Sequence, residues 1–160
     1  MSYRAAVITV SDRASAGTRS DASGPIAVAA LRDAGFECGE PIVVADGAES
    51  VELALRAALA DGARLIVTSG GTGVGPRDAT PEGTARVLTR EVPGIAEELR
   101  RLGAAELPAG MLTRGLAGVV DSAAALIVNL PGSPGGVASG IPVVISVARH
   151  VLDQLGGGDH

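Results

Sequence analysis

The sequence contains no lysine and no tryptophan, and its aromatic side chains are limited to Tyr3 and Phe36. Without lysine, Schiff-base chemistry and the lysine-bearing phosphate loop are both excluded. So few aromatic rings also leave no stacking platform of the kind that binds RNA or single-stranded DNA. The 13 basic residues, all arginine, are outnumbered by 18 acidic residues and form no basic cluster, so we expect no nucleic-acid partner.

Cysteine and histidine are nearly as scarce. Cys38 is the single cysteine, which excludes an intramolecular disulfide, and the N-terminal residues show no signal-peptide cleavage pattern. We therefore expect a cytoplasmic protein. The two histidines, His150 and His160, suggest neither a catalytic triad nor a zinc site. The one long uncharged window, residues 122–148, is interrupted by prolines and glycines, which predicts that no helix spans a membrane.

The hydrophobic pattern predicts an α/β fold. Helical spacing follows Pro25 and Ser50, and two more helices are predicted to start at Thr80 and to run from Pro93 to Gly103. Between and around them, apolar runs rich in β-branched residues predict buried strands at residues 5–10, 42–45, 64–68 and 125–130. Alternating strands and helices predict a largely parallel sheet that is covered on both faces.

The second half of the chain predicts three further features. Residues 116–120 suggest a strand hairpinned onto residues 125–130 as an antiparallel edge. Apolar spacing after Pro142 favours a C-terminal helix, with a strand over residues 143–147 as the alternative. Residues 156–160 are expected to form a flexible tail. The whole chain, residues 1–160, is expected to be a single domain.

Polar residues follow each predicted parallel strand. Ser11, Asp12 and Arg13 follow the first strand, and Asp46 follows the second. The third and fourth strands are followed by residues 69–78 and residues 131–136. Because ligands of open α/β sheets bind at the carboxyl ends of the strands, these segments are expected to meet at one edge.

The glycine-rich run over residues 70–75 predicts an anion site. Its four glycines let backbone N–H groups turn inward around a phosphate, with the hydroxyls of Ser69 and Thr72 as further donors. The run does not match the G-x-G-x-x-G pattern, because Pro76 stands in place of the last glycine. The alternative interpretation is a flexible surface loop.

Two carboxylates, Asp46 and Asp78, could reach the same phosphate through a magnesium ion, which commonly takes one or two protein carboxylates with substrate phosphate oxygens. Helix capping explains both residues equally well, since Asp46 precedes a capping-box glutamate and Asp78 precedes Thr80. Arg77 could hold a phosphate with two hydrogen bonds or could simply be solvated. Asp21 could start a helix or contact an anion, and the spacing favours the helix start.

Five separated motifs resemble the molybdenum cofactor biosynthesis family of molybdopterin-binding proteins, in particular its molybdopterin adenylyltransferases. The resemblance covers about residues 4–155. In chain order the motifs are Val10-Ser11-Asp12-Arg13, Asp21-x-Ser23-Gly24-Pro25, Gly70-Gly71-Thr72-Gly73, Arg77-Asp78-x-Thr80-Pro81-Glu82 and Asn129-Leu130-Pro131-Gly132-Ser133-Pro134.

The resemblance implies a three-layer α/β/α sandwich with a mostly parallel sheet, commonly a homotrimer. The implied reaction joins molybdopterin and MgATP to give adenylyl-molybdopterin and pyrophosphate, and other proteins of the cofactor pathway are possible partners. Asp46 and Asp78 match the catalytic acids, which would act through Mg²⁺ and the substrate phosphates. Gly70, Gly71, Thr72 and Gly73 match the cradle for nucleotide phosphate. The implied pterin and phosphate sites comprise Ser11, Asp12, Ser23, Thr113, Arg114, Pro131, Gly132 and Ser133, to which the loop argument adds Ser69 and Arg77.

One departure from the family pattern keeps alternatives open. Where the family often has two adjacent acids, this chain has Asp46-Gly47, which removes one possible metal ligand. A second departure, Leu112-Thr113-Arg114 in place of Leu-Ser-Arg, keeps the hydroxyl. The main alternative is a homologue that binds or carries molybdopterin without adenylylating it. Relatives that insert molybdate, and a nucleotide pyrophosphatase related to competence-damage proteins, are further alternatives.

Overall fold

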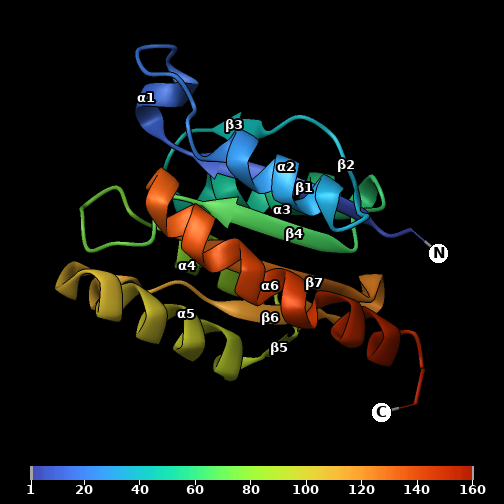
Figure 1. Cartoon of the computed structure of the whole chain (residues 1–160). Helices are drawn as coiled ribbons and strands as arrows, with labels where there is room; N and C mark the ends of the chain where they lie inside the picture. Colours follow the sequence, from blue (N-terminus) through green and yellow to red (C-terminus); the bar gives the residue numbers. More distant parts are fainter. Residues whose placement is uncertain (1, 160) are drawn as a thin grey trace.

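The computed structural model describes residues 2–159 and has a seven-stranded sheet between two layers of helices (Figure 1). The parallel strands are β1 (Arg4–Val10), β2 (Glu37–Cys38), β3 (Ile42–Val44), β4 (Leu65–Ser69) and β7 (Ala125–Leu130). β6 (Ala117–Val120) pairs antiparallel with β7, and β5 (Arg90–Glu91) pairs antiparallel with β6. The four predicted parallel strands are therefore confirmed.

Helices cover both faces of the sheet, as the alternation predicts. α2 (Gly24–Asp33), α5 (Pro93–Glu106) and α6 (Pro134–Leu155) pack on one face, whereas α3 (Ala48–Ala60) packs on the other face beside α4 (Thr80–Ala85). Neighbouring residues of a strand belong to opposite cores: Val7 lies in the core under α2 and α6, and Ile8 lies in the core under α3. This two-residue period confirms the three-layer α/β/α sandwich.

Two strand predictions need correction at the sheet edges. β3 is not buried, since Ile42 is 44% and Val43 is 37% exposed. It pairs with β1 alone in the described part of the chain and therefore leaves its outer edge open. The strand predicted at residues 116–120 does pair antiparallel with residues 125–130, but β5 extends the sheet beyond it, so β6 is not the edge.

The predicted end of the helix from Pro93 was wrong, because α5 continues through Gly103 to Glu106. Gly103 is instead a packing position for the short 3-10 helix η1 (Pro108–Leu112). A Cβ on Gly110 would lie 2.3 Å from the carbonyl carbon of Gly103, so the two backbones pack closer than side chains allow.

The C-terminal helix is confirmed but begins before its predicted start. α6 starts at Pro134, where the Ser133 hydroxyl accepts a hydrogen bond from the Gly136 amide. Pro142 lies inside the helix on an exposed position, so it does not break the helix, and the strand alternative is wrong. Length and composition alone would let α6 cross a membrane, but its buried stripe packs on the sheet through Val137, Ile141, Val144, Ala148 and Leu152.

The predicted flexible tail starts as an ordered turn. The amides of Gly156, Gly157 and Gly158 donate to carbonyls in the last turn of α6. His160, the last residue of the predicted tail, lies outside the described residues.

Candidate functional site

The carboxyl ends of β1, β3, β4 and β7 meet at one edge of the sheet, and a cavity of about 390 Å³ lies there. We call it the polar pocket. The structure places nine predicted site residues on its lining: Ser11, Ser23, Asp46, Ser69, Gly70, Gly71, Asp78, Gly132 and Ser133.

Four other predicted residues line a separate cavity of about 190 Å³ between α5, η1 and α6. We call it the apolar pocket, since it contains Leu99, Leu102 and Leu112. The predicted residues on its lining are Thr72, Gly73, Thr113 and Pro131. The glycine-rich loop therefore contributes to both cavities. Asp12, Arg77 and Arg114 line neither of them.

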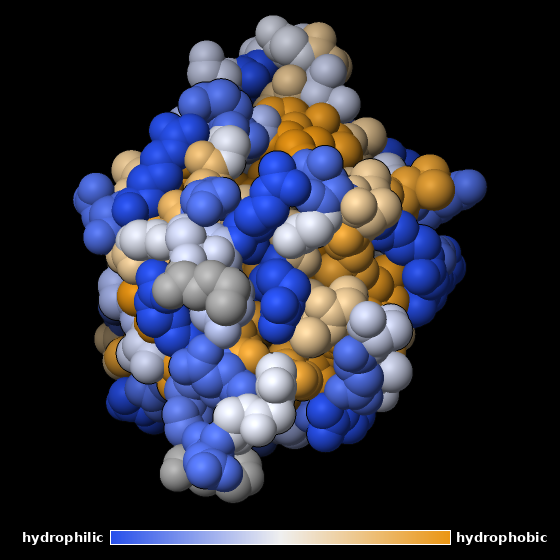
Figure 2. Space-filling model, turned by 90° about the vertical axis from the view of Figure 1, so that its right-hand side faces the viewer, coloured by the Kyte–Doolittle hydropathy of each residue, from blue (hydrophilic) through white to orange (hydrophobic). Residues whose placement is uncertain are grey.

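The opposite end of the sheet, where the parallel strands begin, is the face shown in Figure 2, with apolar side chains between charged ones. A groove of about 720 Å³ beside β2 contains Arg4, Arg32 and Asp61. Among the described residues that line this groove, none belongs to the predicted site.

The start of the glycine-rich loop is fixed by two glycines with positive φ. Gly70 has φ +103° and Gly71 has φ +67°. Thr80 holds both residues, because its hydroxyl donates to the Gly70 carbonyl at 2.8 Å and its amide donates to the Gly71 carbonyl at 3.0 Å. α4 starts at Thr80, as the sequence predicts, but it has no side-chain cap, and the Thr80 hydroxyl anchors the loop instead.

The loop keeps backbone donors available for an anion. Within residues 2–159, the amides of Gly71, Thr72 and Gly73 donate to no protein acceptor. Such consecutive free N–H groups are the requirement for an anion nest. The geometry therefore favours the phosphate interpretation over the flexible surface loop.

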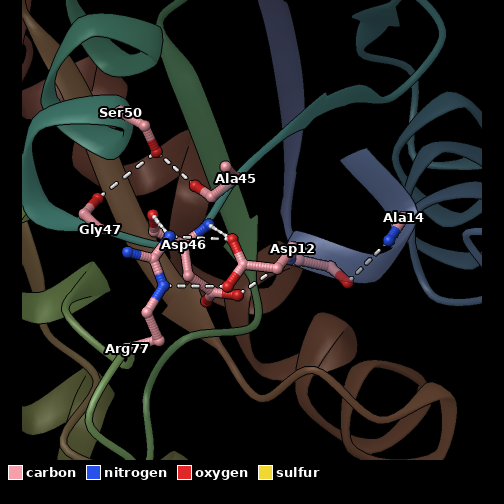
Figure 3. A network of polar contacts seen from close by, with 8 residues as sticks. Asp12, Ala14, Ala45, Asp46, Gly47, Ser50 and Arg77 are labelled. Atoms are coloured by element: carbon pink, nitrogen blue, oxygen red, sulfur yellow. Dashed lines mark hydrogen bonds and ion pairs between the residues drawn. The ribbon is translucent and has the colours of Figure 1, made fainter. Parts of the chain in front are cut away.

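Asp46 is joined to Asp12 by reciprocal hydrogen bonds (Figure 3). The Asp12 amide donates to Asp46 Oδ2 at 3.0 Å, and the Asp46 amide donates to Asp12 Oδ1 at 3.1 Å. Arg77 donates to both oxygens of Asp12 at 3.0 Å and to the Asp46 carbonyl at 3.0 Å. The Arg77 side chain is 64% exposed, yet these contacts tie the ends of β1 and β3 together.

Helix capping does not explain the two candidate acids. α3 begins after Gly47 without a side-chain cap, so Asp46 does not cap α3. Asp78 accepts the Gly75 amide at 2.9 Å within the glycine-rich loop. Asp21 lies at a helix start, as its spacing predicts, because its carboxylate accepts a hydrogen bond from the Gly24 amide at 2.9 Å where α2 begins.

The electrostatics of the site separate Asp12 from Asp46. The hydrogen-bonded Arg77 guanidinium lowers the pKa of Asp12. Burial raises the pKa of Asp46, and the nearby carboxylates of Asp12 and Asp78 raise it further. The negative charge of Asp46 is therefore only partly compensated by the protein, which favours a cation beside it.

The donor set suits a magnesium ion that is completed by substrate. Among the described residues, Asp46 Oδ1 and Asp78 Oδ1 accept no hydrogen bond, so each carboxylate can offer one oxygen. No group of three or more His, Cys, Asp or Glu side chains in the described chain could hold a metal by itself. Magnesium is commonly held by few carboxylates together with phosphate oxygens and water, and these residues fit that pattern.

Arg114 is the second predicted phosphate ligand that is occupied by the protein. Its guanidinium donates to the carbonyls of Gly73 and Asp78 at 2.8 Å each and to Glu82 at 2.7 Å. Its amide donates to the Thr72 carbonyl at 2.8 Å. Arg114 therefore holds the glycine-rich loop from both sides and shapes the site without facing the polar pocket.

Buried hydroxyls form the floor of the polar pocket. The hydroxyls of Ser23 and Ser69 lie 3.0 Å apart, and Ser69 donates to the Pro131 carbonyl at 3.1 Å. Ser23 and Ser69 are buried, at 5% and 0% exposure. These contacts join the start of α2 to the ends of β4 and β7.

Sequence reasoning missed Arg19 and Ser20 on the lining of this pocket. Both lie in the connection between α1 (Asp12–Ser15) and α2, which carries no strand or helix periodicity. The sequence signal that could have found them is their place between Arg13 and Asp21, in the connection of two motifs.

Comparison with known proteins supports one family. A family model described as a probable molybdopterin binding domain matches residues 6–150. The chain is 39% identical over 156 residues to a molybdenum cofactor biosynthesis bifunctional protein of Synechococcus elongatus, covering 98% of this chain and 48% of that protein. It is 35% identical over 153 residues to a molybdopterin adenylyltransferase of Pyrococcus furiosus, covering 94% of this chain and 89% of that protein.

A solved structure gives the same answer. The molybdopterin biosynthesis Mog protein from Mycobacterium ulcerans superposes with a TM-score of 0.90 at 45% identity, covering 96% of this chain and 99% of that chain. The chain spans about half the length of the bifunctional relatives from Synechococcus and Chlorobaculum. The resemblance found in the five sequence motifs is confirmed.

Proposed function

Because the chain belongs to the family of probable molybdopterin binding domains, we propose that it adenylylates molybdopterin in molybdenum cofactor biosynthesis. In this reaction a terminal phosphate oxygen of molybdopterin forms a bond to the α-phosphorus of ATP. The bond between that phosphorus and the oxygen bridging to the β-phosphate breaks, and pyrophosphate leaves. One observation carries the proposal: Asp46 and Asp78 lie on one polar pocket together with Gly71, whose amide donates to no acceptor among the described residues.

The residues of the site can supply what the reaction needs. Adenylyl transfer depends on positioned phosphates and on neutralised charge more than on a protein nucleophile. Gly70, Gly71, Thr72 and Gly73 are proposed to bind nucleotide phosphate through the loop that they form. The hydroxyls of Ser11 and Ser133, on the lining of the polar pocket, are proposed to contact phosphate as well. A bound magnesium ion, held by Asp46 and Asp78, would neutralise the charge that develops on the phosphates.

The residues proposed for substrate divide into two groups. Asp46, Asp78, Ser11, Ser23, Ser69, Gly132 and Ser133 belong to the phosphate side, in the polar pocket. Thr72, Gly73, Thr113 and Pro131 lie on the apolar pocket, across the shared loop. Asp12, Arg77 and Arg114 are proposed to act indirectly, by holding the loops that carry the other residues.

A molybdopterin-binding or carrier protein without transferase activity is the second candidate, and Gly47 favours it. This residue replaces the second acid of the family pattern, and its φ of +125° is a conformation that residues with a side chain rarely adopt. The backbone at this position is therefore adapted to glycine. Either Asp46 binds the metal without a neighbouring acid at position 47, or the site does not transfer adenylyl groups.

The deciding experiment measures pyrophosphate release from MgATP by the purified protein, with and without molybdopterin. We expect release that depends on molybdopterin and is abolished by Asp78→Asn. Asp61→Asn, at the opposite end of the sheet, is the control and should keep full activity. Molybdopterin binding without release would establish the carrier function instead. Hydrolysis of ADP-ribose or pyridine nucleotide without pterin would assign the pyrophosphatase alternative, and molybdate-dependent AMP release from adenylylated pterin would assign insertion.

We further propose that the chain is one domain, acts in the cytoplasm and forms a homotrimer that meets other proteins of the cofactor pathway. Exposed Leu107, Met111 and Leu112 on and beside η1 support a subunit contact, because apolar side chains grouped on a surface mark interaction sites. Light scattering should give three times the mass of one chain. A monomer across micromolar concentrations would contradict the trimer.

A further inference from the structure

The polar pocket is too acidic to hold phosphate with the residues considered so far. Apart from Arg19, its ionisable lining residues are Asp21, Asp46 and Asp78, which give a formal charge of about minus three when all are ionised. A magnesium ion compensates most of that charge, but a polyphosphate adds more. A protein cation that faces the pocket is therefore required to offset the repulsion.

Two arginines expected to provide such a cation are occupied. Arg77 is bound to Asp12, and Arg114 is bound to Glu82 and to loop carbonyls. Within residues 2–159, only the guanidinium groups of Arg13 and Arg19 make no hydrogen bond, ion pair or ring contact. Arg19 lines the polar pocket, whereas Arg13 does not.

The segment that carries Arg19 is held in place at both ends. The Arg13 carbonyl accepts the Thr18 amide at 3.0 Å, the Thr18 hydroxyl at 3.1 Å and the Arg19 amide at 3.3 Å. Asp21, two residues further on, accepts the Thr9 hydroxyl at 2.8 Å as well as the Gly24 amide. In Figure 1 this segment stands with α1 at the end of the molecule where β4 terminates. Arg19 is thus presented to the pocket by an ordered backbone.

We propose that Arg19 binds a phosphate group of a substrate in the polar pocket. The proposal rests on the proposed function only for the identity of the substrates, whose phosphates come from two sources: the triphosphate of ATP and the terminal phosphate of molybdopterin. A guanidinium suits this task because it can donate two parallel hydrogen bonds to phosphate oxygens. Arg19 and the glycine-rich loop line the same pocket, so a phosphate bound there would meet the guanidinium and the free amide of Gly71 together.

The test compares the wild type with Arg19→Gln by isothermal titration with magnesium pyrophosphate, MgATP and molybdopterin. Loss of a charge-assisted contact should weaken binding of at least one of these probes about ten- to hundred-fold. Arg19→Lys should recover part of the affinity, since it keeps the charge without the forked geometry. Arg13→Gln is the matched control, because it removes the same charge from the same exposed segment and should change affinity by less than about threefold, as expected for a screened charge.

The outcomes separate the two sources and the two proposals. Weaker binding of pyrophosphate and MgATP would assign Arg19 to the triphosphate, and weaker binding of molybdopterin alone would assign it to the pterin phosphate. Unchanged affinity of Arg19→Gln for all three probes would overturn the proposal, even in a protein that transfers adenylyl groups. Binding of none of the probes by the wild type would overturn it as well. If binding depends on Arg19 but no pyrophosphate is released, the proposal for Arg19 is supported and the proposed adenylyl transfer is refuted.

Discussion

Replacing Gly71 by alanine tests how closely the glycine-rich loop approaches the rest of the site. A Cβ at this position would lie 2.3 Å from the Thr80 hydroxyl oxygen and 3.0 Å from Asp46 Oδ1. The φ of +67° adds backbone strain, which costs about 1–2 kcal/mol for a residue with a side chain. Relief of the contacts by local movement costs roughly 1–3 kcal/mol more. We therefore expect Gly71→Ala to lower the free energy of unfolding by about 2–5 kcal/mol.

Gly17 provides a matched control. Its φ is +76°, close to that of Gly71, but a Cβ there would have no neighbour within 4 Å. Gly17→Ala should therefore show the backbone cost alone, about 1–2 kcal/mol. The difference between the two variants in urea unfolding measures the close approach, because the conformational cost is common to both.

A double-mutant cycle with Thr80→Ala locates the clash. Removal of the Thr80 hydroxyl deletes the nearest contact and leaves the Thr80 Cβ at 3.3 Å from the added methyl group. The cost of Gly71→Ala should then fall by about 1–3 kcal/mol relative to its cost in the wild type. Equal losses for Gly71→Ala and Gly17→Ala, with no coupling to Thr80, would refute the argument that the loop is packed against this hydroxyl.

Three further substitutions test the contacts around the loop. Arg114→Gln should lower the free energy of unfolding in urea by about 1–3 kcal/mol and speed amide exchange in the loop. The exposed control Arg101→Gln should lower it by less than about 1 kcal/mol. Equal losses would contradict the idea that Arg114 holds the loop. Asn129→Ala should lose about 2–4 kcal/mol, because the buried amide bonds two threonine hydroxyls and a backbone amide; a loss below about 1 kcal/mol would show that water replaces them. The hydrogen bond from Arg114 lowers the pKa of Glu82 below its usual 4.5, so the stability that this pair adds is present above pH 4.5 and is lost as the pH falls through the lowered pKa. Glu82→Gln should therefore reduce the dependence of the free energy of unfolding on pH below 4.5. An unchanged dependence would exclude the effect.

The part of the structure that could be predicted depends on local patterns. The strands β1, β4 and β7 are buried on both faces and show as continuous apolar runs, and the polar residues after them must meet because parallel strands end at one edge. Asp46 and Asp78 could therefore be placed at the same edge without any knowledge of their contacts. The protein contacts of Arg77 and Arg114 could not be predicted in this way, because the partners of a guanidinium lie far away in sequence. Asp12 is 65 residues from Arg77, and Gly73 is 41 residues from Arg114.

Errors at glycine and proline have a related cause. Glycine and proline predict the end of a helix when only the local sequence is considered, but whether the helix ends there depends on what packs beside the residue. Gly103 lies inside a helix because η1 packs on it, and Pro142 lies inside α6 because its exposed position tolerates the missing donor. Gly47 shows the opposite case, since its positive φ is a purely local requirement that the sequence alone does not reveal.

The two pockets share the glycine-rich loop, and this shared wall constrains how any transfer can occur. Thr113 lies on the apolar pocket, and the next residue, Arg114, holds the carbonyls of Gly73 and Asp78 at the loop. A ligand that moves Thr113 is therefore expected to act through Arg114 on the backbone of Asp78, whose side chain lies on the polar pocket. Since a transfer needs both substrates at one phosphorus atom, the reacting groups have to meet where this loop separates the pockets. Binding in the apolar pocket is accordingly expected to affect Asp78, the carboxylate proposed to hold magnesium, through the Arg114 contacts.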